Sequence, residues 1–169
     1  MNKKSELRTK AKLIRKSLDI QNISQKLCEK IRLLEIYKTS KHIMIFYPLK
    51  YEINLLALLN DDKDFYLPKI NGDNLEACPY KSGDTLQIGG FNTLEPTTKA
   101  VNPENLELII IPALMADKNN YRLGYGKGYY DRFLPLTKAY TIVPIAKELV
   151  TDKLPTELHD KPVNSVIIE

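Results

Sequence analysis

Residues 106–112, LELIIIP, carry the strongest β-strand signal in the sequence. The branched apolar side chains continue without the alternation of a half-exposed strand, so this run predicts a central parallel strand covered on both faces. A glycine-rich segment follows, and a helix is expected after it over about residues 127–134. Ligands of α/β sheets bind beyond the carboxyl ends of the strands, so we expect the functional site in this segment.

The remaining apolar runs place further strands and helices around this one. Strands are expected over residues 42–47, 64–68, 75–80, 140–143 and 163–168, and helices over residues 5–18, 23–37 and 54–59. Residues 81–105 are rich in Gly, Pro, Asn and Thr, which predicts an irregular segment. The sequence therefore predicts one domain over residues 1–169, a Rossmann-like, three-layer α/β/α fold with a largely parallel central sheet.

The composition excludes several classes of protein. Of the 169 residues, 43% are hydrophobic and 27% are charged, which is ordinary for a globular domain and unlike a disordered, collagen-like or coiled-coil chain. Cys28 and Cys78 lie far apart and only two histidines are present, so a His/Cys zinc site is not expected.

No segment of the sequence predicts contact with a membrane. The longest apolar run, residues 108–116, is about half as long as a membrane span requires. The Lys-rich start of the chain is not followed by an apolar run, so no signal peptide is expected. These features favour a cytoplasmic protein without a membrane partner.

Basic charge is concentrated at one end of the chain. Residues 1–41 carry 12 Lys or Arg and 4 Asp or Glu, whereas the remainder carries 13 basic and 17 acidic residues, for a net charge of +4. Such asymmetry indicates either an anionic partner (a nucleic acid, a phosphate or a polycarboxylate) or a solvated helix face.

Residues 117–132, DKNNYRLGYGKGYYDR, have the features of a phosphate-binding loop. Three glycines at alternate positions let the backbone turn tightly and bring its amide N–H groups close to a ligand. Arg122 and Lys127 add two cations, and Asp131 is placed where a carboxylate can meet phosphate-bound magnesium. The spacing matches neither the dinucleotide fingerprint nor the P-loop.

The run RLGYGKGYYDR, residues 122–132, with IPALMAD before it, closely resembles the signature of the 5-formyltetrahydrofolate cyclo-ligase family, also called methenyltetrahydrofolate synthetases. The resemblance covers nearly the whole chain and includes KSELR (4–8), FYPLKYE (46–52), LEP (94–96) and LHD (158–160). It implies a C–N bond-forming ligase that uses ATP and Mg²⁺ to cyclise 5-formyltetrahydrofolate to 5,10-methenyltetrahydrofolate, releasing ADP and phosphate. The formyl oxygen would be phosphorylated and then displaced by N10.

The resemblance also implies a role for individual residues. Lys127 and Arg122 would neutralise the transferred phosphoryl group, and Asp131 and Asp160 would lie near the magnesium ion. The residues expected to contact ATP are Lys4, Arg8, Arg122, Leu123, Gly124, Tyr125, Gly126, Lys127, Gly128, Tyr129 and Tyr130. Those expected to contact the folate are Tyr47, Glu52, Tyr125, Gly126, Lys127, Gly128 and Tyr129.

The sequence departs from the family pattern at two positions. Family members usually have a bulky aromatic residue where this chain has Ala116, and a glycine where it has Asn92. Both positions lie outside the phosphate loop, so we expect a change in local packing more than in activity. The expected partner is 5-formyltetrahydrofolate, with or without a polyglutamate tail, bound by a monomer that does not bind nucleic acid.

Two other functions remain open at this point. The basic first helix would also suit a small RNA-binding module, although no RNA-binding motif is present. Another phosphoryl-transfer enzyme or a sugar-phosphate isomerase could use a similar fold, because substrate is a property of the site.

Overall fold

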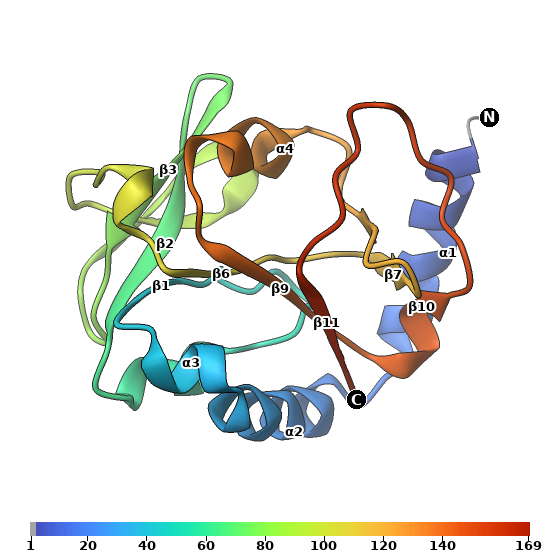
Figure 1. The fold of residues 1–169 in the computed structure, drawn as a ribbon, viewed down its shortest axis with the longest axis horizontal. Coiled ribbons are helices and arrows are strands. Elements are labelled where there is room, and N and C mark those ends of the chain that lie inside the picture. The colour runs from blue at the N-terminus through green and yellow to red at the C-terminus, as the bar shows by residue number, and fades with distance from the viewer. Residues whose placement is uncertain (1–2) are drawn as a thin grey trace.

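The computed structural model describes residues 3–169, and its centre is a six-stranded sheet (Figure 1). The strand order is β11-β9-β6-β1-β2-β3, and every pairing is parallel except that of β2 with β3. The strands are β1 (His42–Met44), β2 (Asp64–Asn71), β3 (Asn74–Pro79), β6 (Leu108–Ile110), β9 (Tyr140–Ile145) and β11 (Ser165–Ile168). The largely parallel sheet and the internal position of β6 are confirmed.

Within the described residues, four α-helices surround the sheet: α1 (Lys3–Lys16), α2 (Ile20–Leu33), α3 (Glu35–Thr39) and α4 (Tyr129–Phe133). The expected single helix over residues 23–37 is wrong, because it is divided at Leu34. That residue has extended backbone angles, φ −67° and ψ 133°, and so separates α2 from α3. At the other end, α2 begins at a cap in which the Asp19 carboxylate accepts a hydrogen bond from the Asn22 backbone N–H.

The alternation of side chains along the strands creates two apolar cores, one on each face of the sheet. Ile43, Leu108 and Ile110 point toward α2 and α3, whereas Met44 and Ile109 point to the opposite face, toward α4 and α1. Figure 1 shows α2 and α3 below the sheet and α4 above it. The fold is therefore three-layered and Rossmann-like, as the sequence predicts.

Two smaller sheets lie beside the central one. β7 (Met115–Asp117) pairs with β8 (Arg122–Leu123) and β10 (Val150–Thr151). β4 (Leu86–Ile88) and β5 (Leu94–Pro96) form an antiparallel hairpin, so the expectation that residues 81–105 are irregular is wrong. The hairpin escapes sequence analysis because each of its strands has only three residues.

A 3₁₀-helix replaces one of the expected helices, and a second expected helix starts later than predicted. Residues 54–59 were expected to form a helix, and the structure has a 3₁₀-helix at Leu56–Asn60. The helix expected over residues 127–134 begins only at Tyr129, because Gly128 before it is left-handed with φ +72°. The other 3₁₀ turns are Gly90–Asn92, Pro103–Asn105, Leu134–Leu136 and Lys147–Leu149. Within residues 3–169, no helix has the length and apolar character needed to cross a bilayer.

The packing of α2 on the sheet can be tested with two leucines of the same helix. Leu27 is fully buried, whereas Leu33 is 73% exposed. Leu27→Ala should lower the free energy of unfolding by about 2–5 kcal/mol, because it leaves a cavity in the core, and Leu33→Ala should change it by less than about 0.5 kcal/mol. Equal effects of the two substitutions in urea denaturation would contradict this account of the core.

Candidate active site

A cavity of about 600 Å³ opens beyond the carboxyl ends of the central strands. Phe46 and Tyr47, which follow β1, and Pro112, which follows β6, lie in its wall. The structure brings together here every residue to which the sequence assigns a role in binding ATP, folate or metal: Lys4, Arg8, Tyr47, Glu52, residues 122–131 and Asp160. Their roles remain predictions, but their common location is a property of the fold.

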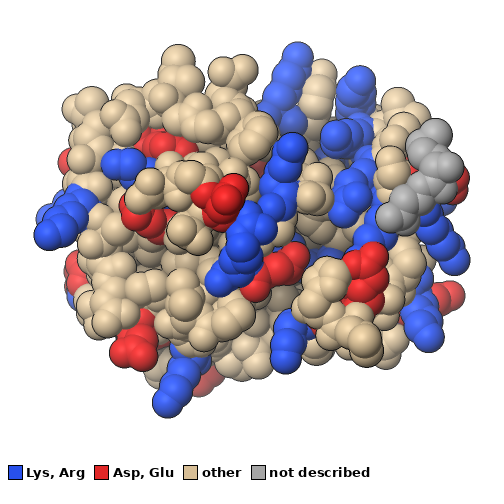
Figure 2. Space-filling view, turned by 90° about the horizontal axis from the view of Figure 1, so that it is seen from above, with Lys and Arg blue, Asp and Glu red and all other residues tan. Residues whose placement is uncertain are grey.

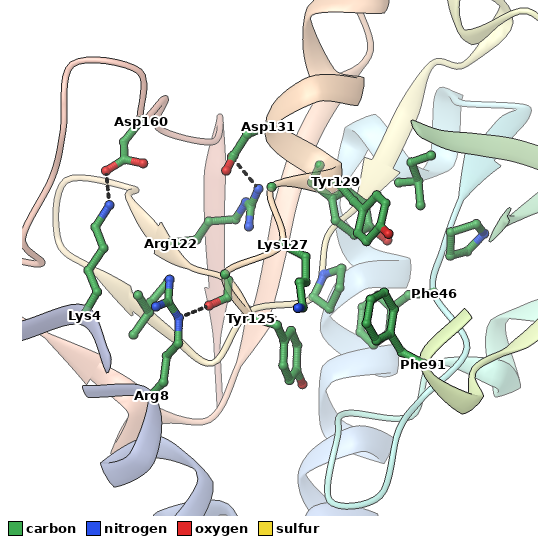
Figure 3. A pocket seen from close by; sticks show the side chains of 18 of the residues that line it. Lys4, Arg8, Phe46, Phe91, Arg122, Tyr125, Lys127, Tyr129, Asp131 and Asp160 are labelled. Carbon is green, nitrogen blue, oxygen red and sulfur yellow. Dashed lines mark hydrogen bonds and ion pairs between the residues drawn. The ribbon is translucent and has the colours of Figure 1, made fainter. Parts of the chain in front are cut away.

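One wall of the cavity is cationic. Lys4 and Arg8 reach it from α1, and Arg8 Nε donates a hydrogen bond to the Gly124 carbonyl at 2.9 Å (Figure 3). Lys4 Nζ lies 2.6 Å from Asp160 Oδ2. Seen from above, Lys and Arg side chains gather across the middle and right of the molecule, toward α1 (Figure 2). The basic N-terminal helix thus contributes directly to the cavity.

Arg122, from β8, is a nearly buried cation of this wall. Its side chain is only 8% exposed, and its Nη2 lies 2.9 Å from Asp131 Oδ1. Burial lowers the pKa of the Arg122 guanidinium, and the neighbouring carboxylate opposes that shift. The guanidinium also lies 5.7 Å from the centre of the Tyr130 ring. These contacts hold Arg122 in one orientation at the edge of the cavity.

The two carboxylates predicted to lie near magnesium are both paired with cations, Asp131 with Arg122 and Asp160 with Lys4. Burial alone would raise the pKa of Asp160, but hydrogen bonds from Lys4 and the Glu157 backbone N–H lower it below its ordinary value. Among residues 3–169, no three His, Cys, Asp or Glu side chains are grouped as a metal site. Asp131 and Asp160 are thus separate carboxylates, and within the described residues they form no closed cage for a metal.

Glycines shape the loop that runs through the cavity. Gly126 is left-handed, with φ +96°, and a Cβ added there would lie 3.1 Å from Arg8 Cζ. A side chain at this position would therefore be strained and would crowd the guanidinium. Because α4 has only five residues, the cations around the loop, rather than a long helix, supply its positive charge.

A partly buried chain of hydrogen bonds fixes the middle of this loop. Arg15 Nη1 donates to Tyr125 Oη at 2.7 Å, and Tyr125 Oη donates to Glu52 Oε1 at 2.6 Å. The second Glu52 oxygen accepts the Leu49 backbone N–H at 2.8 Å, and Arg15 also donates to the Ala113 carbonyl. These hydrogen bonds join α1, the glycine-rich loop and the segment after β1.

Sequence reasoning missed Arg15, although a signal was present. Arg15 follows Ala11 by four residues, so the two share one face of α1, and both are buried. A basic residue on the apolar stripe of a helix needs a buried partner, since an unpaired buried charge is costly. The sequence therefore shows that Arg15 is an exception to the apolar pattern of α1, but it does not show which residues Arg15 contacts.

The opposite wall is apolar and aromatic. It includes Phe46 after β1, Ile70 and Leu75 of the main sheet, and Phe91 from the β4–β5 hairpin. Phe91 meets Tyr129 edge to face, with 6.2 Å between ring centres, and Lys127 Nζ lies 5.1 Å from the Phe91 ring centre. Lys127 therefore stands where the cationic and aromatic walls meet (Figure 3).

The two departures from the family pattern are accommodated locally. Asn92 has φ +56°, in the left-handed region, where Asn is the non-glycine residue best tolerated. Ala116 is fully buried in β7 and is paired with Arg122 in β8. Neither residue lines the cavity.

The fold and the cavity define a class of protein: an α/β protein whose cavity has one cationic wall and one apolar, aromatic wall. The chain belongs to the 5-formyltetrahydrofolate cyclo-ligase family, whose model matches residues 1–169. It is therefore an enzyme of the ligase class. This membership argues against an RNA-binding module or a sugar-phosphate isomerase.

Individual relatives agree with this assignment. The 5-formyltetrahydrofolate cyclo-ligase of Mus musculus is 28% identical over 156 residues, which cover 79% of this chain and 75% of the mouse protein. That of Mycoplasma genitalium is 31% identical over 121 residues, covering 71% and 67% respectively. The NMR structure of Aquifex aeolicus 5,10-methenyltetrahydrofolate synthetase has a TM-score of 0.87 and 32% identity, covering 98% of this chain and 89% of that one.

The hydrogen bonds of Tyr125 have a testable consequence for the pH at which its phenol loses its proton. Burial, followed by the charge of Glu52, raises the pKa of Tyr125 above its ordinary value of 10.0, so the phenol should remain protonated when the pH reaches about 10. Wild-type protein and Tyr125→Phe should therefore gain the same tyrosinate absorbance up to this pH while both remain folded. One additional tyrosinate in the wild type would contradict the assigned burial and partners of Tyr125.

Proposed function

We propose that this enzyme performs the ATP- and magnesium-dependent cyclisation of 5-formyltetrahydrofolate to 5,10-methenyltetrahydrofolate, with release of ADP and phosphate. The observation that carries the proposal is the cavity with two unlike walls. A cationic wall and an aromatic wall face each other across residues 122–130, so a polyphosphate and a pterin ring can lie within reach of one another.

The cationic wall suits the nucleotide. Arg8 and Arg122 present guanidinium groups, which form paired hydrogen bonds with phosphate oxygens, and Lys4 and Lys127 add ammonium groups. Loop amides complete the expected contacts. The residues proposed to bind ATP are Lys4, Arg8, Arg122, Leu123, Gly124, Tyr125, Gly126, Lys127, Gly128, Tyr129 and Tyr130.

The aromatic wall suits the folate. Flat rings gain stabilisation from stacked or edge-to-face contact with aromatic side chains such as Tyr129 and Phe91. Glu52, which accepts hydrogen bonds from Tyr125 and the Leu49 backbone N–H, is proposed to orient the reduced ring or N10, and this role does not require it to act as a general base. The residues proposed to contact the folate are Tyr47, Glu52, Tyr125, Gly126, Lys127, Gly128 and Tyr129.

The carboxylates fit a magnesium ion that arrives with the nucleotide. Magnesium is commonly held by one or two carboxylates together with substrate phosphates, and Asp131 and Asp160 are proposed as those carboxylates. The ion would supply positive charge to the phosphate oxygens. In the structure Arg122 pairs with Asp131 and Lys4 pairs with Asp160. Each of these two cations can bind phosphate oxygens as well as carboxylate oxygens.

The reaction needs an activated formyl group. A formamide is a poor electrophile, because resonance stabilises its carbonyl and its oxygen is a poor leaving group. Transfer of the γ-phosphoryl group to the formyl oxygen breaks the bond to ADP and forms a P–O bond. The N10 lone pair then attacks the formyl carbon, N10 loses its proton, and the C–O bond breaks to release phosphate.

The residues of this chain contribute positioning and charge neutralisation, which dominate catalysis of phosphoryl transfer. Lys127 and Arg122 are proposed to neutralise the charge on the transferred group. Arg122 is held by Asp131 at 2.9 Å, and Lys127 stands at the junction of the two walls. Loss of one such contact typically lowers turnover by about two to three powers of ten.

The direct test is to mix purified protein with ATP, magnesium and 5-formyltetrahydrofolate and to follow the near-ultraviolet absorption of the methenyl product. Product should form only when all three are present, with one ADP released per product. ATP hydrolysis without product, or product without ATP, would contradict the proposal.

The role of Lys127 gives a prediction for a single substitution. Lys127→Ala should lower turnover at least about 100-fold, because a charge-neutralising contact is lost, and should leave the thermal midpoint nearly unchanged. Lys138→Ala is the matched control, since Lys138 is exposed and lies outside the cavity. Near-normal turnover of Lys127→Ala would refute its assignment.

A further inference from the structure

The β4–β5 hairpin places a second buried carboxylate in the cavity wall. Glu95, in β5, is 3% exposed and lines the cavity at its apolar end, beside Ile70, Leu94 and Phe91. It differs from Glu52, both of whose oxygens accept hydrogen bonds from neighbouring groups. Glu95 is not among the residues proposed to bind ATP, folate or magnesium.

The hydrogen bonds of Glu95 leave one of its oxygens available. Oε1 accepts the Ile70 backbone N–H at 3.0 Å, and no donor within residues 3–169 is bonded to Oε2. In the same part of the chain, no buried side-chain oxygen lacks a partner. Oε2 must therefore lie at an accessible surface, and the cavity is the surface that Glu95 lines.

The backbone around Glu95 is shaped to hold this carboxylate. A Cβ added to Gly89 would lie 1.9 Å from Glu95 Cδ, so the carboxylate lies in space that only glycine leaves open. Phe91 and Asn92 both have left-handed backbones, with φ +57° and +56°, which is costly for Phe. This turn presents the Phe91 ring, 61% exposed, to the cavity and to Tyr129.

Within residues 3–169, no cation forms an ion pair with Glu95. A nearly buried carboxylate with an unused acceptor in an apolar wall is unfavourable unless a ligand supplies donors. This end of the cavity combines an aromatic surface with a free carboxylate oxygen. Both suit a flat ring with two adjacent N–H donors on one edge. One of its faces would lie against the aromatic pair of Phe91 and Tyr129, and its edge would meet Glu95.

We infer that Glu95 binds the amino-pyrimidinone edge of the folate ring, accepting hydrogen bonds from the 2-amino group and N3–H. The inference rests on the proposed function and adds the residue that recognises this end of the substrate. It also orients the folate: the amino-pyrimidinone edge lies against β5, and the formyl group points toward Lys127 and the cationic wall. Glu95 then favours folates, which carry these two donors, over flat rings that lack them.

The test is Glu95→Gln, whose amide oxygen still accepts the Ile70 N–H while the charge is removed. A hydrogen bond to a charged group is worth enough to change affinity about 10- to 100-fold. The KM for 5-formyltetrahydrofolate should rise by this factor, while the KM for ATP should change by less than about twofold. Glu76→Gln is the control, because Glu76 lies in the neighbouring β3, bonded to Asn71, and outside the cavity lining.

A substrate analogue keeps the inference testable even if the variant folds poorly. Wild-type enzyme should bind 2-desamino-5-formyltetrahydrofolate about 10- to 100-fold more weakly than the parent, because Glu95 then lacks a donor. In Glu95→Gln the two compounds should bind nearly alike. Equal binding by the wild type, or an unchanged folate KM in a folded Glu95→Gln, would overturn the inference. If wild-type enzyme cyclised no 5-formyltetrahydrofolate at all, the proposed function itself would fail instead.

Discussion

The site depends on the partly buried hydrogen bonds from Arg15 to Tyr125 and from Tyr125 to Glu52. A glycine-rich loop is flexible by composition, and a ligand-binding loop must hold its groups in place before the ligand arrives. Tyr125 gives the loop one fixed point, because its hydroxyl donates to a buried carboxylate and accepts from a buried guanidinium. Burial keeps this phenol protonated by raising its pKa, so the donor is retained. Three distant segments are thereby held together around the cavity.

The parallel sheet explains why such distant segments meet. The segments that carry Glu52 and the glycine-rich loop leave neighbouring strands, β1 and β6, at the same edge of the sheet. Helix α1 brings its cations to that edge from the start of the chain, and the β4–β5 hairpin brings Phe91 from the other side. The result is a cavity with one cationic wall and one aromatic wall, which suits the proposed transfer of a phosphoryl group from ATP to a formylated folate.

Local patterns in the sequence predicted part of this arrangement, because they depend on neighbouring residues. The continuous apolar run of residues 106–112 identified the internal strand, and the alternating glycines identified the loop. The β4–β5 hairpin was missed because its strands are too short for periodicity and its turn uses left-handed Phe91 and Asn92. The sequence also did not predict the partners of Arg15, since Tyr125 lies 110 residues away in the sequence and is brought near only by the fold.

The central claim is that the terminal phosphoryl group of ATP meets the formyl oxygen of the folate inside this cavity. A heavy-isotope label placed on that oxygen reports the encounter directly, when the released phosphate is analysed by mass spectrometry after a single turnover. The account predicts that the label appears in inorganic phosphate, one atom for each methenyl product. Release of the label into water, with none in phosphate, would contradict it.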